Sequence, residues 1–264
     1  MAEGLTYGSD AAAGYDRAFG HVSARFVPSL VQATCLVPGM RVLDIATGTG
    51  LVAEAALATV GSTGQVTADD LSSAMLTKVR ERLGGHANVS FAAEDGQALS
   101  FADGSFDAVL CGLGLMFFPD PARGLAEFRR VLHPGGRVAV SVSTVPERSY
   151  NGRINVVIAR HTPSLAESTA RMFALGDKAR LCSLIEDAGF RDVEIATEAH
   201  RFTFPSFDAY FEPFARGGAS SGQAFSALPE EERRAVREEV RRALGDTGGP
   251  IEVEVEVRIA SGRR

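Results

Sequence analysis

Cysteine is scarce in this sequence of 264 residues, and its few occurrences are poorly spaced for shared chemistry. Cys35, Cys111 and Cys182 are far apart, odd in number, and form no Cys-x-x-Cys pair. Zinc sites and disulfide frameworks both need clustered or evenly paired cysteines. We therefore expect a reduced, cytoplasmic protein without a zinc site, and we expect no other metal in its functional site.

Long apolar runs are also lacking. Residues 108–118 form the most apolar segment, yet they are far too few to span a bilayer and include two glycines. The first ten residues show no basic stretch followed by an apolar core, so we expect no secretory signal. The sequence thus predicts a protein without stable membrane insertion.

The sequence has no excess of positive charge. Lysine and arginine total 27 against 33 acidic residues, which gives a formal net charge of −6. Nucleic acids and anionic membranes attract strongly basic proteins. We therefore expect a small molecule as the partner, no nucleic acid, and a monomer or a homodimer.

What the sequence does contain is a glycine-rich turn between a short apolar run and a helix. Residues 41–50 read Arg-Val-Leu-Asp-Ile-Ala-Thr-Gly-Thr-Gly, and residues 51–60 are rich in alanine and leucine. The first run predicts a buried strand and the second a helix. A helix N-terminus offers free N–H groups, and glycines let a ligand approach the backbone closely. The stretch therefore predicts the first half of a nucleotide-binding unit.

Strands and helices alternate along most of the chain. Strands are expected at 41–45, 65–68, 88–93, 106–111, 137–143, 193–196 and 251–259, and helices at 51–60, 73–83, 121–132, 177–188 and 229–244. This alternation predicts an α/β fold with a parallel sheet, helices on both faces, and a ligand site where the strands end. The glutamates at 252, 254 and 256 form the polar face of the last strand, and we expect them to reach solvent.

The glycine turn alone leaves two interpretations open. Residues 48–53 fit the pattern G-x-G-x-x-A, and Asp70 follows Gly48 by 22 residues (70 − 48). Both features belong to the dinucleotide fingerprint. A nicotinamide-dependent dehydrogenase is therefore an alternative at this stage.

Three acids at the ends of successive strands favour a different ligand. Asp44 would repel a pyrophosphate but attract an ammonium group. Asp70 can accept hydrogen bonds from both ribose hydroxyls, and Asp95 can accept one from the amine of adenine. A molecule with an ammonium group, a ribose, an adenine and no phosphate is S-adenosylmethionine, which is the cofactor that the sequence indicates.

Five segments in a fixed order resemble one enzyme family. The segments are residues 42–50, 70–76, 95–99, 105–109 and 130–137. Over about residues 15–145 the chain resembles the class I S-adenosylmethionine-dependent methyltransferases, of the ubiquinone/menaquinone-biosynthesis and small-molecule branch. The resemblance implies a Rossmann-like, doubly wound, seven-stranded and mostly parallel sheet of order 3-2-1-4-5-7-6. It also implies a single domain, 1–264, with a helical cap built from 1–35, 146–176 and 200–248.

The resemblance also implies the residues of the site. The cofactor is expected to contact Tyr15, Arg25, Asp44, Ala46, Thr47, Gly48, Gly50, Asp70, Leu71, Met75, Asp95, Gly96, Gln97 and Cys111. The acceptor pocket is expected to contain Phe19, Met116, Phe117 and Phe118. For Tyr15 the alternative role is helix packing, and for Arg25 it is a solvated surface charge.

The methyl acceptor and a catalytic base are less well defined by the sequence. His21 and His161 are the preferred candidates for a base, although positioning and desolvation can drive methyl transfer without one. The apolar residues 116–118 favour a small, largely apolar acceptor, methylated on oxygen or carbon, of aromatic or polyketide-like type. No Asn-Pro-Pro-Tyr motif is present, which disfavours methylation of nucleic-acid bases. A non-methylating reaction on the same fold, such as a cyclisation, remains the alternative.

Overall fold

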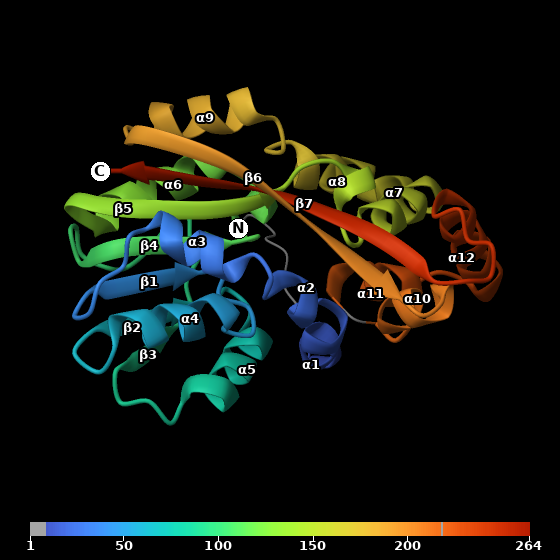
Figure 1. The fold of residues 1–264 in the computed structure, drawn as a ribbon, viewed down its shortest axis with the longest axis horizontal. Helices are drawn as coiled ribbons and strands as arrows, with labels where there is room; N and C mark the ends of the chain where they lie inside the picture. Colours follow the sequence, from blue (N-terminus) through green and yellow to red (C-terminus); the bar gives the residue numbers. More distant parts are fainter. Residues whose placement is uncertain (1–8, 218) are drawn as a thin grey trace.

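A seven-stranded sheet forms the centre of the protein, whose computed structural model describes residues 9–217 and 219–264 (Figure 1). The strand order is β3-β2-β1-β4-β5-β7-β6, with β7 antiparallel to both neighbours and the other described pairings parallel. This order confirms the fold that the resemblance predicts. The strands are β1 (Arg41–Ile45), β2 (Gln65–Asp69), β3 (Val89–Ala92), β4 (Phe106–Gly112), β5 (Leu132–Ser143), β6 (Arg191–Phe204) and β7 (Ile251–Arg263).

Helices cover both faces of the sheet. Successive strand residues point to opposite faces, and the residues that point to either face are apolar. Val42 of β1 packs in one hydrophobic cluster, and its neighbour Leu43 packs in a second cluster on the opposite face. The first cluster includes side chains of α3 (Val27–Ala33), α4 (Leu51–Val60) and α5 (Ser73–Leu83). The second includes side chains of α6 (Pro121–Val131) and α9 (Lys178–Asp187).

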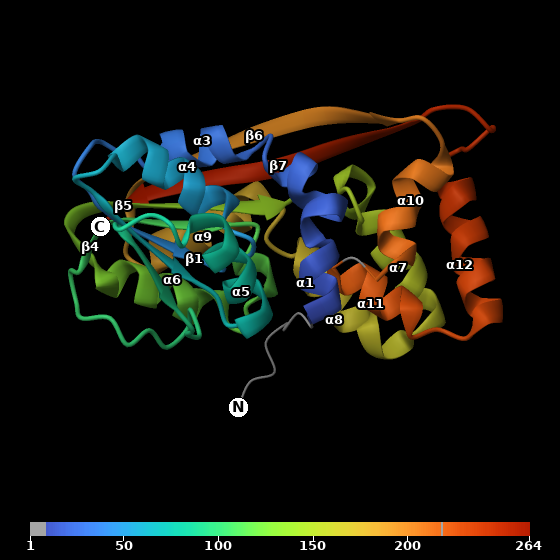
Figure 2. The same ribbon diagram turned by 90° about the horizontal axis from the view of Figure 1, so that it is seen from below.

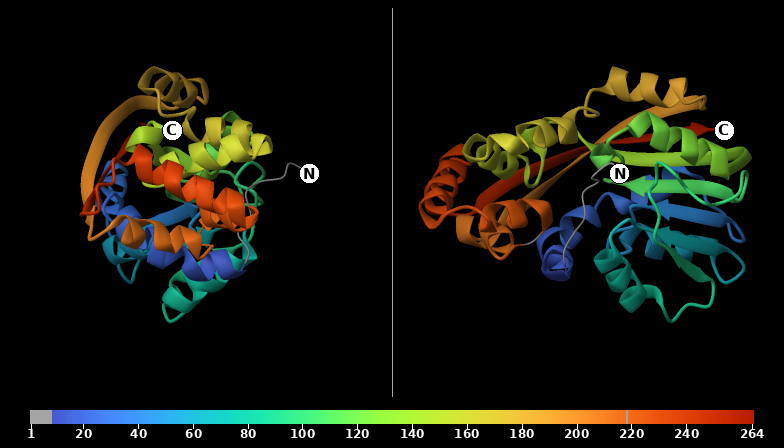
Figure 3. Two further views of the ribbon diagram at one scale, coloured as in Figure 1. Left: turned by 90° about the vertical axis from the view of Figure 1, so that its right-hand side faces the viewer. Right: turned by 180° about the vertical axis from the view of Figure 1, so that it is seen from behind.

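A group of helices, called the cap helices below, lies at the far end of β6 and β7 (Figure 2). These two strands run beyond the parallel strands and join the sheet to the cap (Figure 3). The cap helices are α7 (Gly152–His161), α8 (Ala166–Phe173), α10 (Phe207–Ala215), α11 (Ala219–Ser226) and α12 (Glu230–Ala243). None of the described helices is long and apolar enough to cross a membrane.

The N-terminal segment bridges the two parts. It consists of α1 (Ser9–Tyr15), a π-helical turn at Asp16–Gly20 and α2 (His21–Ser23). α1 contacts both α11 of the cap and α5 of the sheet region. Residues 1–8 and Gly218, which belong to the expected cap segments, lie outside the described residues.

Three details of the sequence-based elements are wrong. β6 extends over Arg191–Phe204 and not over 193–196, because an edge strand exposes many of its side chains and needs no apolar alternation. β5 begins at Leu132 and not at 137, because Leu132 already pairs with Phe106 of β4; a register shift then leaves residues 133–136 unpaired with β4 before Arg137 pairs with Ala108. The acidic face of β7 is only partly solvated: Glu252 is exposed, but Arg148 covers Glu256 through an ion pair of 2.5 Å.

Aromatic side chains pack the junction between β6 and the cap. The Tyr210 hydroxyl donates a hydrogen bond of 2.6 Å to the backbone carbonyl of Tyr150, and both side chains are almost fully buried. The Tyr150 hydroxyl is also buried, but it has no hydrogen-bond partner among the described residues. The ring of Tyr150 packs against those of Phe19, Phe204 and Phe214. One tyrosine hydroxyl thus stabilises the junction, and the other does not.

This contrast gives a prediction about stability. Tyr210→Phe leaves a buried carbonyl without its donor and should lower the free energy of unfolding by about 1–3 kcal/mol. Tyr150→Phe removes only an unpaired hydroxyl and should leave stability unchanged or slightly raised. Urea denaturation of the two variants beside the wild type measures both effects. Equal stability of the two variants would contradict this account of the junction.

Candidate active site

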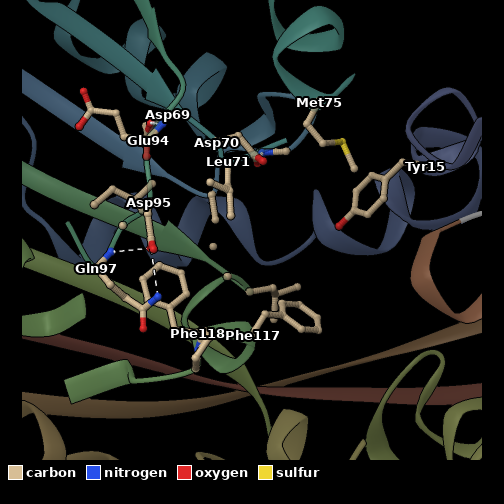
Figure 4. Close-up of a pocket in the computed structure, with 18 residues that line it drawn as sticks. Tyr15, Asp69, Asp70, Leu71, Met75, Glu94, Asp95, Gln97, Phe117 and Phe118 are labelled. Carbon is tan, nitrogen blue, oxygen red and sulfur yellow. Dashed lines mark hydrogen bonds between the residues drawn. The ribbon is translucent and has the colours of Figure 1, made fainter. Parts of the chain in front are cut away.

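A cavity opens at the carboxyl ends of β1, β2, β3 and β4 (Figure 4). Tyr15 and Met75 lie at one end of it, and Asp69 and Glu94 lie at the other. The predicted cofactor residues that line this cavity are Tyr15, Ala46, Gly48, Asp70, Leu71, Met75, Asp95, Gly96 and Gln97. Residues from four separate segments of the chain therefore meet at one edge of the sheet, where the doubly wound fold places a ligand.

The glycine turn after β1 needs glycine for its backbone shape. Gly48 has φ of +57° and Gly50 has φ of +91°. A Cβ atom on Gly50 would lie 2.5 Å from Cγ2 of Val79, so α5 packs directly on this residue. A Cβ atom on Gly48 would meet nothing within 4 Å, which leaves its backbone open to the cavity.

Asp44 lies beneath this turn, fully buried, and does not line the cavity. Thr47 donates its hydroxyl to Oδ2 of Asp44 at 2.6 Å, while Oδ1 has no partner among the described residues. Burial raises the pKa of Asp44 from its ordinary value to about 7. A cationic ligand above the turn would favour the ionised form of this carboxyl.

Asp70 and Asp95 are both held by backbone donors. The N–H groups of Gly48 and Ser72 each donate to Asp70 at 2.8 Å, so this carboxyl joins the glycine turn to the start of α5. Asp95 accepts hydrogen bonds from the backbone N–H and the side-chain amide of Gln97, at 2.9 and 3.0 Å. The two acids thereby have fixed positions on the wall of the cavity.

Asp69 is a site residue that the sequence did not single out. Its side chain is 1% exposed and lines the cavity. Oδ1 accepts the backbone N–H of Glu94 at 3.0 Å, whereas Oδ2 is buried with no partner among the described residues. Burial raises its pKa to about 8, and the nearby carboxyls of Glu94 and Asp70 add to this shift.

The available signal for Asp69 was the doublet Asp69-Asp70 at the end of a strand. Neighbouring strand residues point to opposite faces, so only one of the two acids can face the glycine turn. The other side chain, Asp69, lies under the segment that carries Asp95. Other lining residues that were not predicted are Ile45, Glu94, Gly112, Leu113, Gly114 and Pro119.

The N-terminal segment is fastened over the glycine turn by Asp16. Thr49 donates its hydroxyl to one Asp16 oxygen at 2.5 Å, and Arg82 pairs with the other at 2.6 Å. Tyr15 stacks on Phe19 with ring centroids 5.3 Å apart. Tyr15 lines the acid-lined cavity at the strand ends, called the cofactor cavity below because the cofactor is expected there, and it also lines a narrow cavity.

The narrow cavity and a larger one beside it contain the predicted acceptor residues. Phe19, Met116 and Phe117 line the narrow cavity together with Tyr150 and Met172. The larger cavity, called the outer chamber below, has a volume of about 640 Å³ and lies between α7, α8, α11 and residues 116–119. Met116, Phe117 and Met172 line both spaces, and Phe118 lines the outer chamber and the cofactor cavity.

Several predicted residues are not brought to these cavities. His21 packs its ring against Tyr150 and Phe204, and burial lowers its pKa. His161 lies 3.4 Å from Glu239 of α12. Neither histidine belongs to the described linings, and the same holds for Arg25, Gly50 and Cys111. Thr47 lines a small neighbouring cavity, which shares Tyr15, Ala46 and Gly48 with the lining of the cavity at the strand ends.

The sequence of the chain is similar to known methyltransferases. Residues 43–140 match the family model described as a methyltransferase domain. A demethylmenaquinone methyltransferase of Clavibacter sepedonicus is 38% identical over 176 residues, which cover 62% of this chain and 70% of that protein. A ubiquinone/menaquinone biosynthesis C-methyltransferase of Shewanella halifaxensis is 34% identical over 174 residues, covering 59% and 68%.

A solved structure shows the same fold at lower identity. It is a phosphoethanolamine N-methyltransferase of Haemonchus contortus in complex with phosphomonomethylethanolamine and S-adenosylhomocysteine. The TM-score is 0.63, the identity is 17%, and the match covers 98% of this chain and 58% of that one. At this identity the likeness concerns the fold alone.

The buried state of Asp69 predicts a pH-dependent stability difference. An unfolded aspartate loses its proton near pH 4, whereas Asp69 in the folded protein keeps its proton until about pH 8. The folded state therefore binds more protons in this window, and stability falls as pH rises through it. The Asp69→Asn variant has no carboxyl to ionise. Its free energy of unfolding, relative to that of the wild type, should therefore rise by up to about 4 kcal/mol between pH 5 and pH 8.

Urea denaturation at several pH values measures this difference. Asp192→Asn changes an exposed carboxyl and is the matched control, which should show no comparable trend. A constant difference between Asp69→Asn and the wild type across the window would mean that Asp69 is ionised in the folded protein.

Proposed function

The chain belongs to the class I S-adenosylmethionine-dependent methyltransferases, and from this premise we propose that it methylates a ring carbon of a reduced, quinone-type aromatic acceptor. Because the chain belongs to this family, the alternative of a nicotinamide-dependent dehydrogenase, which the glycine turn alone left open, is dropped. The observation that carries the finer proposal is the pair of relatives, whose names specify demethylmenaquinone and C-methylation. The cavities of this chain support an aromatic acceptor independently.

The cofactor is proposed to lie along the acid-lined cavity. Asp70 would accept hydrogen bonds from the ribose hydroxyls, and Asp95 would accept one from the adenine amine. Leu71, whose side chain is 45% exposed at the cavity, offers an apolar face for the adenine ring. Gly48 leaves room for the methionine part, and Tyr15 would close over it.

The narrow cavity is proposed to hold the reacting ring. Five aromatic side chains and two methionines belong to its lining, namely Tyr15, Phe19, Phe26, Phe117, Tyr150, Met116 and Met172. Such walls bind aromatic rings through apolar burial and ring contacts. They also exclude water, which would otherwise solvate an anionic oxygen on the ring and weaken its neighbouring carbon as a nucleophile.

The bound cofactor supplies an electrophilic methyl group, and its transfer to a ring carbon leaves neutral S-adenosylhomocysteine. The chain's own contribution is to align the two molecules and to keep them dry. The reaction of a phenolate with a sulfonium removes both charges. Apolar walls therefore favour the uncharged products over the charged reactants. The methylated ring carbon then gives its proton to water and the ring oxygen takes one up, which restores the aromatic phenol. The positions of His21 and His161 offer no side-chain base for this proton, so we propose that positioning carries most of the acceleration.

Incubation with methyl-labelled S-adenosylmethionine and 1,4-naphthalenediol, kept reduced, tests the proposed reaction. We expect one molecule of S-adenosylhomocysteine for each ring-methylated product, with the label on carbon by NMR. Label on oxygen would contradict C-methylation. A rearranged acceptor without S-adenosylhomocysteine would support the cyclisation alternative.

The proposal also predicts the behaviour of the two histidines. A general base usually contributes ~100-fold or more to the rate. His21→Gln and His161→Gln should each keep kcat within about threefold of the wild type, because neither ring lines a cavity. Steady-state kinetics with 1,4-naphthalenediol measure this. A loss on the scale of a general base in either variant, with KM unchanged, would restore that histidine as the base.

A further inference from the structure

The acid-lined cavity and the outer chamber differ sharply in charge. Among the described residues, the cofactor cavity is lined by four acids, Asp69, Asp70, Glu94 and Asp95, and by no basic residue. The lining of the outer chamber contains no acid and one arginine, Arg171 of α8. Residues 117–119 belong to both linings and form the partition between them.

Arg171 is not neutralised by the described part of the chain. Some arginines of the cap helices bind carboxylates: Arg160 pairs with Glu239, and Arg237 pairs with Asp208 at 2.8 Å. No ion pair or hydrogen bond of the Arg171 guanidinium is found among the described residues. Its side chain is exposed at the chamber, while the next residue, Met172, is buried in the chamber wall.

Neutral polar groups accompany this arginine. Thr162, Ser168, Thr169 and Gln223 line the chamber from α7, α8 and α11 and the connections between them. Asn155 is 8% exposed, and its side-chain amide nitrogen contacts only the Met172 sulfur, at 3.4 Å, a weak acceptor. Apolar side chains, Met116, Ile158 and Leu228 among them, make up the rest of the wall.

We propose that the outer chamber binds an anionic group, such as a carboxylate or a sulfonate, carried by the aromatic acceptor away from the methylated carbon. This inference rests on the proposed function and adds the substrate class. Coulomb repulsion from the four acids disfavours an anion in the cofactor cavity, whereas Arg171 attracts one on the other side of the partition. Guanidinium groups bind such anions through paired N–H donors. The charge of the acceptor thereby sets its orientation, with the neutral or phenolic ring toward the narrow cavity.

Two fluorescent dyes of the same skeleton test the proposal. 8-Anilinonaphthalene-1-sulfonate carries a sulfonate, and N-phenyl-1-naphthylamine lacks it. Both are titrated into the full-length chain saturated with S-adenosylhomocysteine, which keeps them out of the cofactor cavity. The chain contains no tryptophan, so the dye emission is measured without that background.

The expected result is a selective loss in one variant. Arg171→Gln should weaken binding of the sulfonate dye by about tenfold, since charge-assisted hydrogen bonds are lost, and should change binding of the neutral dye by less than about twofold. Arg180→Gln on α9 alters an exposed arginine that is absent from the chamber lining, and it should affect neither dye. Ala224→Phe fills the chamber and should weaken both dyes.

Three results would overturn the proposal. They are an unchanged affinity of Arg171→Gln for the sulfonate dye, equal losses for both dyes, and dye binding that Ala224→Phe does not affect. Calorimetry with S-adenosylhomocysteine on each variant distinguishes a failure of the proposed function from a failure of the anionic-acceptor proposal. If the wild type fails to bind this molecule, the proposed function fails, and the inference falls with it. If binding is normal and the dye pattern fails, only the anionic acceptor is wrong.

Discussion

Carboxyl groups withdrawn from water at the ends of β1 and β2 are the constraint on which the rest of the site depends. Burial raises the pKa of Asp44, Asp69 and Asp70, and the nearby charge of Asp70 raises the pKa of Asp44 and of Asp69 further. The donors that stabilise them are the Thr47 hydroxyl and backbone N–H groups of the glycine turn and of the segment after β3. The carboxyls therefore fix the loops that form the cavity, and the cavity suits a ligand that brings positive charge.

The second half of the chain contributes the cap helices, which line the outer chamber. β6 and β7 extend past the sheet and support the cap helices, whose inner sides form the outer chamber (Figure 1). Residues 117–119 after β4 line both the acid-lined cavity and the outer chamber, whereas Tyr15 lines both the acid-lined cavity and the narrow cavity. The acid-lined cavity and the narrow cavity share Tyr15, Leu113 and Phe117, and an in-line displacement would need the methyl group and the ring carbon to meet directly beside these residues.

The sheet could be predicted from the sequence because its signals are local, and most of the expected cofactor residues line one cavity at its edge. Asp70 and Asp95 follow apolar strands directly, and the glycines at 48 and 50 are required by positive φ angles. The length of β6 could not be predicted, because an edge strand need not alternate. Asp69 was missed since its role depends on which face of β2 meets the segment after β3.

The roles of histidines depend on tertiary packing and were also beyond the sequence. His21 lies among aromatic rings, and His161 lies beside a glutamate 78 residues away in the sequence. Arg171 has no signal at all in the sequence, because an arginine on an amphipathic helix normally faces solvent. Its significance comes only from the acid-free lining around it.

The most direct test of the central claim is a calorimetric comparison of two ligands on the same protein preparation. The account predicts that S-adenosylmethionine, which carries a cation and no phosphate, binds to the acid-lined cavity, and that NAD⁺ with its pyrophosphate shows no measurable binding at equal concentrations. Binding of NAD⁺ as tight as that of S-adenosylmethionine, or tighter, would contradict the role assigned to the buried carboxyls.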